Sequence, residues 1–271
     1  MQYDPIKRSL GSVVSHAPWM RIFFYHLLDL LLLRSWHIKR ALKKWNKTTS
    51  SASILDAGSG FGQYTYGLAS LNSAYSILGV DVKDEQIADC NEFFSKIGLG
   101  NRVHFEVQDL TRYKVDNKYD LVLSVDVMEH ILEDEQVFQN FYASMTEGGL
   151  LLISTPSDLG GSDSDEHDED GAHGFIDEHV RDGYNINDIR EKLSRAGFKN
   201  IKAKYSYGTP GHISWILSMK WPITMLGISK VFFILLPFYY IVTFPWCLIL
   251  NAFDLYMDHK TGTGLIVEAY K

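Results

Sequence analysis

The sequence of 271 residues is long enough to form one large domain or two small ones with a proper core. Its formal net charge is −7 and its isoelectric point is about 5.8, which excludes a general nucleic-acid-binding surface. Two cysteines, Cys90 and Cys247, offer neither a disulfide framework nor a metal quartet, and this favours a reducing cytosol. The segment MQYDPIKRSL lacks the apolar core of a signal peptide, so we do not expect export.

The N-terminal region predicts an irregular arm over residues 1–18, followed by a helix from Trp19 to about Trp45. The apolar part of this helix is interrupted by polar residues, so it is too short and too polar to span a bilayer unaided. Its far end is basic, with Arg34, Lys39, Arg40, Lys43 and Lys44. Two interpretations stay open: a helix packed on the rest of the domain, or an amphipathic helix on a membrane surface.

A glycine-rich stretch follows a short apolar run over residues 53–57. Such a run, bounded by glycine, is typical of a strand buried on both faces. Gly58, Gly60 and Gly62 allow positive φ angles and bring bare backbone close to a ligand, and the helix predicted after them points its N–H groups at the same place. The loop is therefore predicted to bind a nucleotide-like molecule. It does not fit the dinucleotide pattern G-x-G-x-x-G, because Gln63 stands at the third glycine position.

Strand and helix signals then alternate, which predicts a parallel α/β sheet. Strands are expected at 76–81, around 105–110, at 119–124, 148–156, 198–207 and 264–270, and helices at 84–97, 135–145 and 186–196.

The spacing D-x-G-x-G-x-G over residues 56–62 resembles motif I of the class I S-adenosylmethionine (SAM) methyltransferases, a family that includes the quinone-pathway O-methyltransferases. Asp81 and Asp109, after the second and third strands, match the later motifs in order, so the resemblance covers about residues 53–207 and the last strand. It implies a Rossmann-like, seven-stranded sheet with an antiparallel last strand. It also implies that Asp56 and the loop hold the methionine part of SAM, Asp81 the ribose and Asp109 the adenine. The cofactor-binding residues expected in this way are Asp56, Gly58, Ser59, Gly60, Gly62, Tyr64, Asp81, Val82, Asp109, Leu110 and Asp126.

After the fourth strand, Asp126, Glu129 and His130 form a D-x-x-E-H pattern whose polar groups should lie within about one helical turn. It is similar to the E-x-x-E-H ligand set of metal-dependent relatives, with Asp126 in place of their first Glu. The resemblance implies that His179 completes a site for a divalent ion, Mg²⁺ or Zn²⁺. Without a metal, His130 or His179 is the candidate general base, and Glu129 is a further candidate catalytic residue.

Residues 208–262 separate the sixth and seventh strands, where the family fold has a hairpin. Within them, residues 231–250 are 20 positions without a charge, which by length alone could span a membrane. Both ends join strands of one sheet, so we expect a re-entrant hairpin, an interfacial helix pair, or a lid or dimer interface. Pro237 and Pro245 should kink any helix there.

The expected organisation is an N-terminal arm and helix over 1–50, a SAM-binding core over 51–207, a membrane-associating or lid insertion over 208–262, and the final core strand over 263–271. The expected function is SAM-dependent methylation, on oxygen, of a hydrophobic lipid-like or polyketide/quinone-like molecule. The enzyme would be cytoplasmic and peripherally attached to a membrane, with no nucleic-acid partner and with a homodimer left open. The alternatives are an inactive SAM-binding membrane adaptor and an NAD(P)-dependent oxidoreductase.

Overall fold

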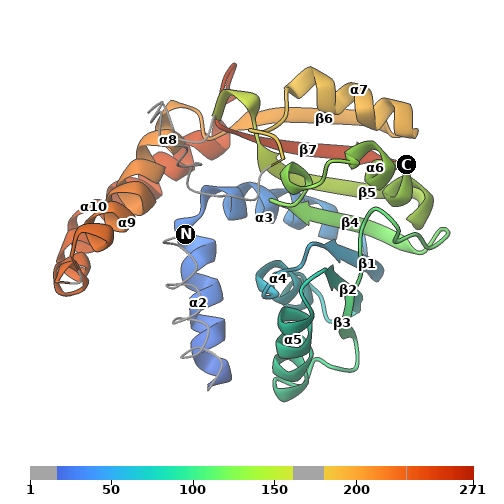
Figure 1. The fold of residues 1–271 in the computed structure, drawn as a ribbon, viewed down its shortest axis with the longest axis horizontal. Coiled ribbons are helices and arrows are strands. Elements are labelled where there is room, and N and C mark those ends of the chain that lie inside the picture. The colour runs from blue at the N-terminus through green and yellow to red at the C-terminus, as the bar shows by residue number, and fades with distance from the viewer. Residues whose placement is uncertain (1–16, 161–179, 230) are drawn as a thin grey trace.

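The computed structural model describes residues 17–160, 180–229 and 231–271. Seven strands form one sheet in the order β3-β2-β1-β4-β5-β7-β6 (Figure 1). The strands are β1 Ala52–Ala57, β2 Tyr75–Asp81, β3 Val103–Val107, β4 Tyr119–Val125, β5 Met145–Pro156, β6 Lys199–Ser206 and β7 Gly264–Tyr270. β7 pairs antiparallel with both of its neighbours, and the other pairings are parallel. The predicted sheet, including its antiparallel last strand, is confirmed.

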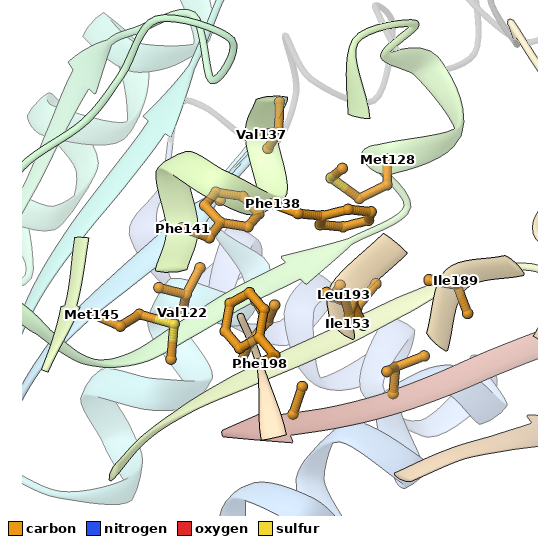
Figure 2. Close-up of a cluster of buried hydrophobic side chains, with 14 of the residues drawn as sticks. Val122, Met128, Val137, Phe138, Phe141, Met145, Ile153, Ile189, Leu193 and Phe198 are labelled. Carbon is orange, nitrogen blue, oxygen red and sulfur yellow. The ribbon is translucent and has the colours of Figure 1, made fainter. Parts of the chain in front are cut away.

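Helices cover both faces of this sheet and bury two apolar clusters. On one face α6 (Asp134–Ser144) and α7 (Ile186–Ala196) contribute Phe138, Phe141 and Leu193 (Figure 2). On the other face α3 (Leu33–Asn46), α4 (Gln63–Leu71) and α5 (Asp84–Lys96) pack their apolar sides. The central strands carry continuous apolar runs because both of their faces are buried.

The single helix predicted from Trp19 to Trp45 is wrong, because the chain breaks at Leu32. Leu32 is extended and buried, and it separates α2 (Pro18–Leu31) from α3. The break lets the two helices take different directions. α3 packs its buried side on the sheet, whereas α2 leaves Trp19 and Phe23 more than 60% exposed. The buried side of α3 agrees with the first interpretation, a helix packed on the rest of the domain, and a membrane-surface role of this region stays a prediction.

Between β6 and β7 the chain forms α8 (Thr209–Trp215), a π-helical turn η3 (Ile216–Lys220), α9 (Trp221–Ile228) and α10 (Phe232–Tyr256). These helices extend away from the sheet (Figure 1), and we call them the helical arm. α10 runs as one helix through Pro237 and Pro245, so the chain does not turn back at the prolines, and the predicted kink stays a prediction. The chain reverses instead around Ser229, which is extended and accepts a hydrogen bond from Val231 N through its side chain.

Exposure distinguishes the helical arm from the other helices. α10 is long and apolar enough to cross a membrane by length and composition, and only 6% of its most apolar window is buried. A core helix of a soluble protein would pass the same test of length and composition, but it would be largely buried. α10 instead exposes large apolar side chains such as Phe238 and Ile241.

Candidate functional site

The glycine loop lies at the carboxyl end of β1 and is held by β2. Gly58, Gly60 and Gly62 all have positive φ angles, of 80°, 51° and 83°, as the sequence predicts. The Gly58 and Ser59 amides donate to the carbonyl of Val80 over 2.8 and 2.9 Å. A Cβ added at Gly58 would lie 2.2 Å from Val127, whereas one at Gly60 would meet nothing within 4 Å. The loop is thus packed on one side and open on the other, which suits a bound ligand.

Two acids brace the loop from the strand ends. The carboxylate of Asp81 accepts from Gly60 N over 3.0 Å and from Lys83 N over 3.1 Å, so it joins β2 to the loop. Asp56 is buried beneath the loop and accepts from the Thr65 hydroxyl in α4. Burial raises the pKa of Asp56 to about 6. Asp56 therefore supports the loop from below, and its predicted contact with the methionine part of SAM stays a prediction.

The residues predicted for the adenine side lie past the ends of β2 and β3. Asp109 is half-exposed and accepts from the amide and hydroxyl of Thr111 over 2.9 and 2.7 Å, which lowers its pKa. It therefore organises the turn after β3 and keeps a carboxylate at this edge. Val82 is exposed and Leu110 is buried in the core. Their roles toward adenine also remain predictions.

Side chains of helix α2 hydrogen-bond to the glycine loop, a contact that the sequence did not predict. Arg21, only 4% exposed, donates to the carbonyl of Phe61 over 2.7 Å and pairs with Asp89 over 2.5 Å. The Tyr25 hydroxyl donates to the same carbonyl. Gln63 reaches Asp29 over 2.8 Å. The polar side chains of α2 thus bind the loop and the start of α4. From the sequence they are interpreted only as polar breaks in an apolar stretch.

Arg34, in the first turn of α3, forms an ion pair with Asp126 at the end of β4. The amide of Arg34 donates to the hydroxyl of Tyr207 over 3.1 Å, and Tyr207 follows the end of β6. Burial raises the pKa of Tyr207 to about 12, so its hydroxyl stays protonated at neutral pH. The Tyr64 hydroxyl lies 3.1 Å from Ser35 Oγ. An arginine, a carboxylate and two tyrosines therefore meet at the edge where β4 and β6 end.

Three buried polar atoms without a hydrogen-bond partner among the described residues belong to this edge: Ser59 Oγ, Ser124 Oγ and Arg34 Nε. Ser59 is in the glycine loop and Ser124 is near the end of β4. Buried polar groups are normally paired, so a gathering of unpaired ones indicates a missing polar ligand. The residues present therefore fit a zwitterionic cofactor such as SAM, with a carboxylate and an ammonium group to be held.

The D-x-x-E-H residues do not form the compact set expected from their spacing. Asp126 has a positive φ of 52° and pairs with Arg34, and His130 lies in the short turn η1 (Met128–His130). Glu129 is 1% exposed and accepts from the Thr155 hydroxyl over 3.0 Å. Burial and the nearby Asp126 carboxylate raise the pKa of Glu129 to about 8.

A metal site does not fit these donors. Within residues 17–160, 180–229 and 231–271, no group of three metal-ligating side chains comes together. Asp126 is already held in an ion pair with Arg34, which a metal ion would have to displace because ligand carboxylates must be free. His179, the fourth predicted ligand and second candidate base, lies outside the described residues, and we derive no step through a metal.

Sequence reasoning missed Arg34 and Tyr207. Arg34 was counted with the basic end of the long helix, yet it is a lone cation in the run LLLLRSW and so carried a local signal. Tyr207 ends the sixth strand at the ligand-binding edge, where any polar residue is a candidate.

Comparisons with known proteins agree with this geometry. Residues 48–196, more than half of the chain, match a family model described as a methyltransferase domain. Phosphoethanolamine N-methyltransferase 1 of Triticum aestivum is 28% identical over 155 residues, which are 56% of this chain and 29% of that protein. A malonyl-[acyl-carrier protein] O-methyltransferase of Bacillus cereus is 29% identical over 149 residues, 55% of this chain and 51% of the relative.

Among solved structures, the fold resembles Haemonchus contortus phosphoethanolamine N-methyltransferase 2 bound to phosphomonomethylethanolamine and S-adenosylhomocysteine. The TM-score is 0.60 at 22% identity, over 85% of this chain and 51% of that one. The chain spans less than a third of the wheat relative's length, so the likeness concerns one domain. The family match removes the oxidoreductase alternative. The chain belongs to the methyltransferase domain family and, by its fold and motifs, to the class I SAM-dependent methyltransferases.

Proposed function

We propose that this protein transfers a methyl group from SAM to a hydrophobic, lipid-like acceptor at a membrane surface. One observation carries the proposal: Tyr207 follows β6 at the candidate site, and the chain passes directly into the helical arm, whose long helix exposes large apolar side chains such as Phe238 and Ile241. An apolar surface at the mouth of a SAM site suits a substrate that resides in a membrane. In this proposal residues 51–207 and 263–271 form the catalytic core, and residues 208–262 attach it to the membrane.

The cofactor would lie across the open side of the glycine loop. SAM, when bound, supplies an electrophilic methyl group on a sulfonium centre. Asp81 is placed to accept from the ribose hydroxyls, because its carboxylate already ends β2 beside Gly60. Arg34 and Asp126 carry the charges that complement the carboxylate and ammonium of the methionine part. The loop glycines allow the backbone to approach the cofactor closely.

The acceptor would lie between β4, β6 and the start of α3. Methyl transfer is an in-line displacement, so the protein mainly positions the nucleophile against the methyl group. Tyr64 and Tyr207 offer hydroxyls there. An oxygen nucleophile must also lose a proton, and His130 at the end of β4 is our candidate base, with His179 as its alternative.

Methylation of an amine is a second candidate chemistry. The wheat relative is named a phosphoethanolamine N-methyltransferase, and it is 28% identical to this chain over 155 residues. Asp126, Tyr64 and Tyr207 present oxygen atoms that would also hold an ammonium group. Fragmentation of the product in a mass spectrometer shows whether the added methyl group is on oxygen or on nitrogen, so this measurement distinguishes the two chemistries.

The experiment that tests the function incubates the purified protein with SAM carrying a labelled methyl group and a total lipid extract. We expect label in a lipid product that mass spectrometry can fragment to locate the methyl group. The variant Asp81→Ala should bind SAM weakly in calorimetry and label nothing. SAM binding without any labelled lipid, or with label only in water-soluble acceptors, would contradict the proposed substrate class. SAM binding with no labelled product of any kind would favour the membrane adaptor.

A further inference from the structure

A groove with a volume of about 1050 Å³ lies among the described residues, and none of the predicted SAM-binding residues lines it. Its walls come from α3, the second half of α2, β6 and the end of α10. It therefore lies at the roots of the two elements that expose apolar faces, α2 and the helical arm. We call it the basic groove, because seven cationic side chains line it: Lys39, Arg40, Lys43, Lys44, Lys47, Lys202 and Lys204.

The charge of this groove opposes the charge of the protein. The whole chain carries −7, yet the groove holds those seven cations against three carboxylates. Two of the carboxylates are already used, since Asp29 pairs with Lys39 over 2.7 Å and Asp258 with Lys204 over 2.6 Å. Lys43, Lys44 and Lys202 are exposed and have no ion pair within the described residues. Such a local excess of unpaired cations indicates an anionic partner.

The rim of the groove is apolar and aromatic. Tyr256 is 75% exposed, and the guanidinium of Arg40 lies 4.7 Å from the centre of its ring. Trp36 and Leu30 line the groove beside it. From Tyr256 the apolar surface continues along α10 through Phe253. Aromatic side chains bordered by cations on one side and apolar surface on the other are typical of the boundary between lipid headgroups and acyl chains.

We propose that the basic groove binds the phosphate headgroups of anionic phospholipids in a bilayer that α2 and the helical arm enter with their apolar faces. This inference rests on the membrane attachment in the proposed function and deepens it by naming the lipid class. A soluble polyanion would find the cations but leave the adjoining apolar surface uncovered. A neutral bilayer would cover that surface but leave the cations without partners. An anionic bilayer satisfies both.

The test measures co-sedimentation of the full chain with vesicles of neutral phosphatidylcholine and with vesicles of a phosphatidylcholine–phosphatidylglycerol mixture. The triple variant Lys43→Gln, Lys44→Gln, Lys202→Gln removes three exposed charges. Each cation near an anionic surface contributes about 1 kcal/mol, so binding to the mixed vesicles should weaken by roughly 100-fold. Binding to neutral vesicles should not change, and added salt should weaken binding of the unmodified protein to the mixed vesicles.

The matched control replaces Lys114, Lys118 and Lys199 by glutamine. These lysines are exposed and do not line the basic groove. The control should keep its affinity for mixed vesicles. Thermal unfolding of each variant checks the fold, and Lys43→Gln alone, with an expected loss of about fivefold, serves if the triple variant does not fold.

Three results would overturn the inference. They are an unchanged affinity of the triple variant for mixed vesicles, an equal loss with both triple variants, or a loss that is the same for neutral vesicles. A thermal shift by inorganic phosphate that the triple variant abolishes, with vesicle binding intact, would identify a site for soluble anions instead. Methyl transfer is measured separately, so lipid binding without a methylated lipid would leave the groove assigned and refute only the proposed substrate.

Discussion

The sheet and the helical arm differ in how they treat their apolar side chains. The sheet buries them under its helices, whereas the arm exposes many of them. Around the sheet nearly every large apolar residue is covered, and Ile153 on β5 is 0% exposed. On α10 the corresponding residues face outward, and Ile241 is 71% exposed. The difference teaches that apolar composition alone does not define a core, because α10 packs one side on α8, η3 and α9 while its outward apolar side chains meet no further layer among the described residues.

The largest expected effect is the difference in stability between a substitution in the sheet and the same substitution in the arm. Ile153→Ala should lower the free energy of unfolding by about 2–5 kcal/mol, because it leaves a cavity between the sheet and its helices. Ile241→Ala removes the same atoms from an exposed site and should change that free energy by less than about 0.5 kcal/mol in detergent-free buffer. Chemical denaturation measures both. A similar loss for the two variants would mean that α10 is covered in solution, for example by a second copy.

The next effect concerns the packed side of the glycine loop. Gly58→Ala places a Cβ 2.2 Å from Val127 at a φ of 80°, and we expect a cost of about 2–4 kcal/mol in stability together with loss of SAM binding. Gly67→Ala is the matched control, since its Cβ meets nothing within 4 Å inside α4. The control should be neutral or slightly stabilising. Calorimetric titration with SAM and thermal unfolding report the two effects separately.

A smaller effect should separate cofactor binding from membrane attachment. Asp81→Asn weakens a charged contact to Gly60 and, in the proposed function, a contact to the ribose, so SAM affinity should fall by about 10- to 100-fold. Phe238→Ser in the arm should leave SAM affinity unchanged and weaken vesicle binding. If the arm variant lowered SAM affinity as much as Asp81→Asn, the two regions would not be independent in solution.

The smallest expected effect is a pH dependence inside the core. Burial raises the pKa of Glu129 from 4.5 to about 8, so between these pH values the folded state holds a proton that the unfolded state has lost. The free energy of unfolding should therefore decrease as the pH rises through this window. Glu129→Gln should remove that decrease and be more stable than the unmodified protein at pH 8 by about 1–2 kcal/mol. Equal pH profiles of the two proteins would show that Glu129 is ionised in the folded state.

The sequence predicted the strands well because each one is marked by a local apolar run and a motif that follows it along the chain. The bounds of α7 and β7 agree to the residue, and the glycine loop has the backbone conformation that its spacing requires. It could not predict the break at Leu32, since Leu32 lies in a uniform leucine run and its extended conformation follows from tertiary packing.

The candidate site was only partly predictable for the same reason. Arg34 reaches Asp126 from a helix 92 positions earlier in the chain, and no spacing rule connects the two. Glu129 and His130 were chosen by spacing, but spacing does not tell which of them turns inward. Burial of Glu129 against Thr155 decided this.

Helix α2 has a consequence for how lipid and cofactor influence each other. Its outer face exposes Trp19, Phe23 and Leu27, while its inner face holds the carbonyl of Phe61 through Arg21 and Tyr25. If a bilayer binds the outer face, as we propose, it would favour the position of α2 in which the inner face holds the glycine loop. By thermodynamic reciprocity, SAM would then increase the affinity for the bilayer by the factor that the bilayer increases the affinity for SAM. Under the proposed function, one helix would thus give the enzyme its highest affinity for SAM at the membrane that holds its substrate.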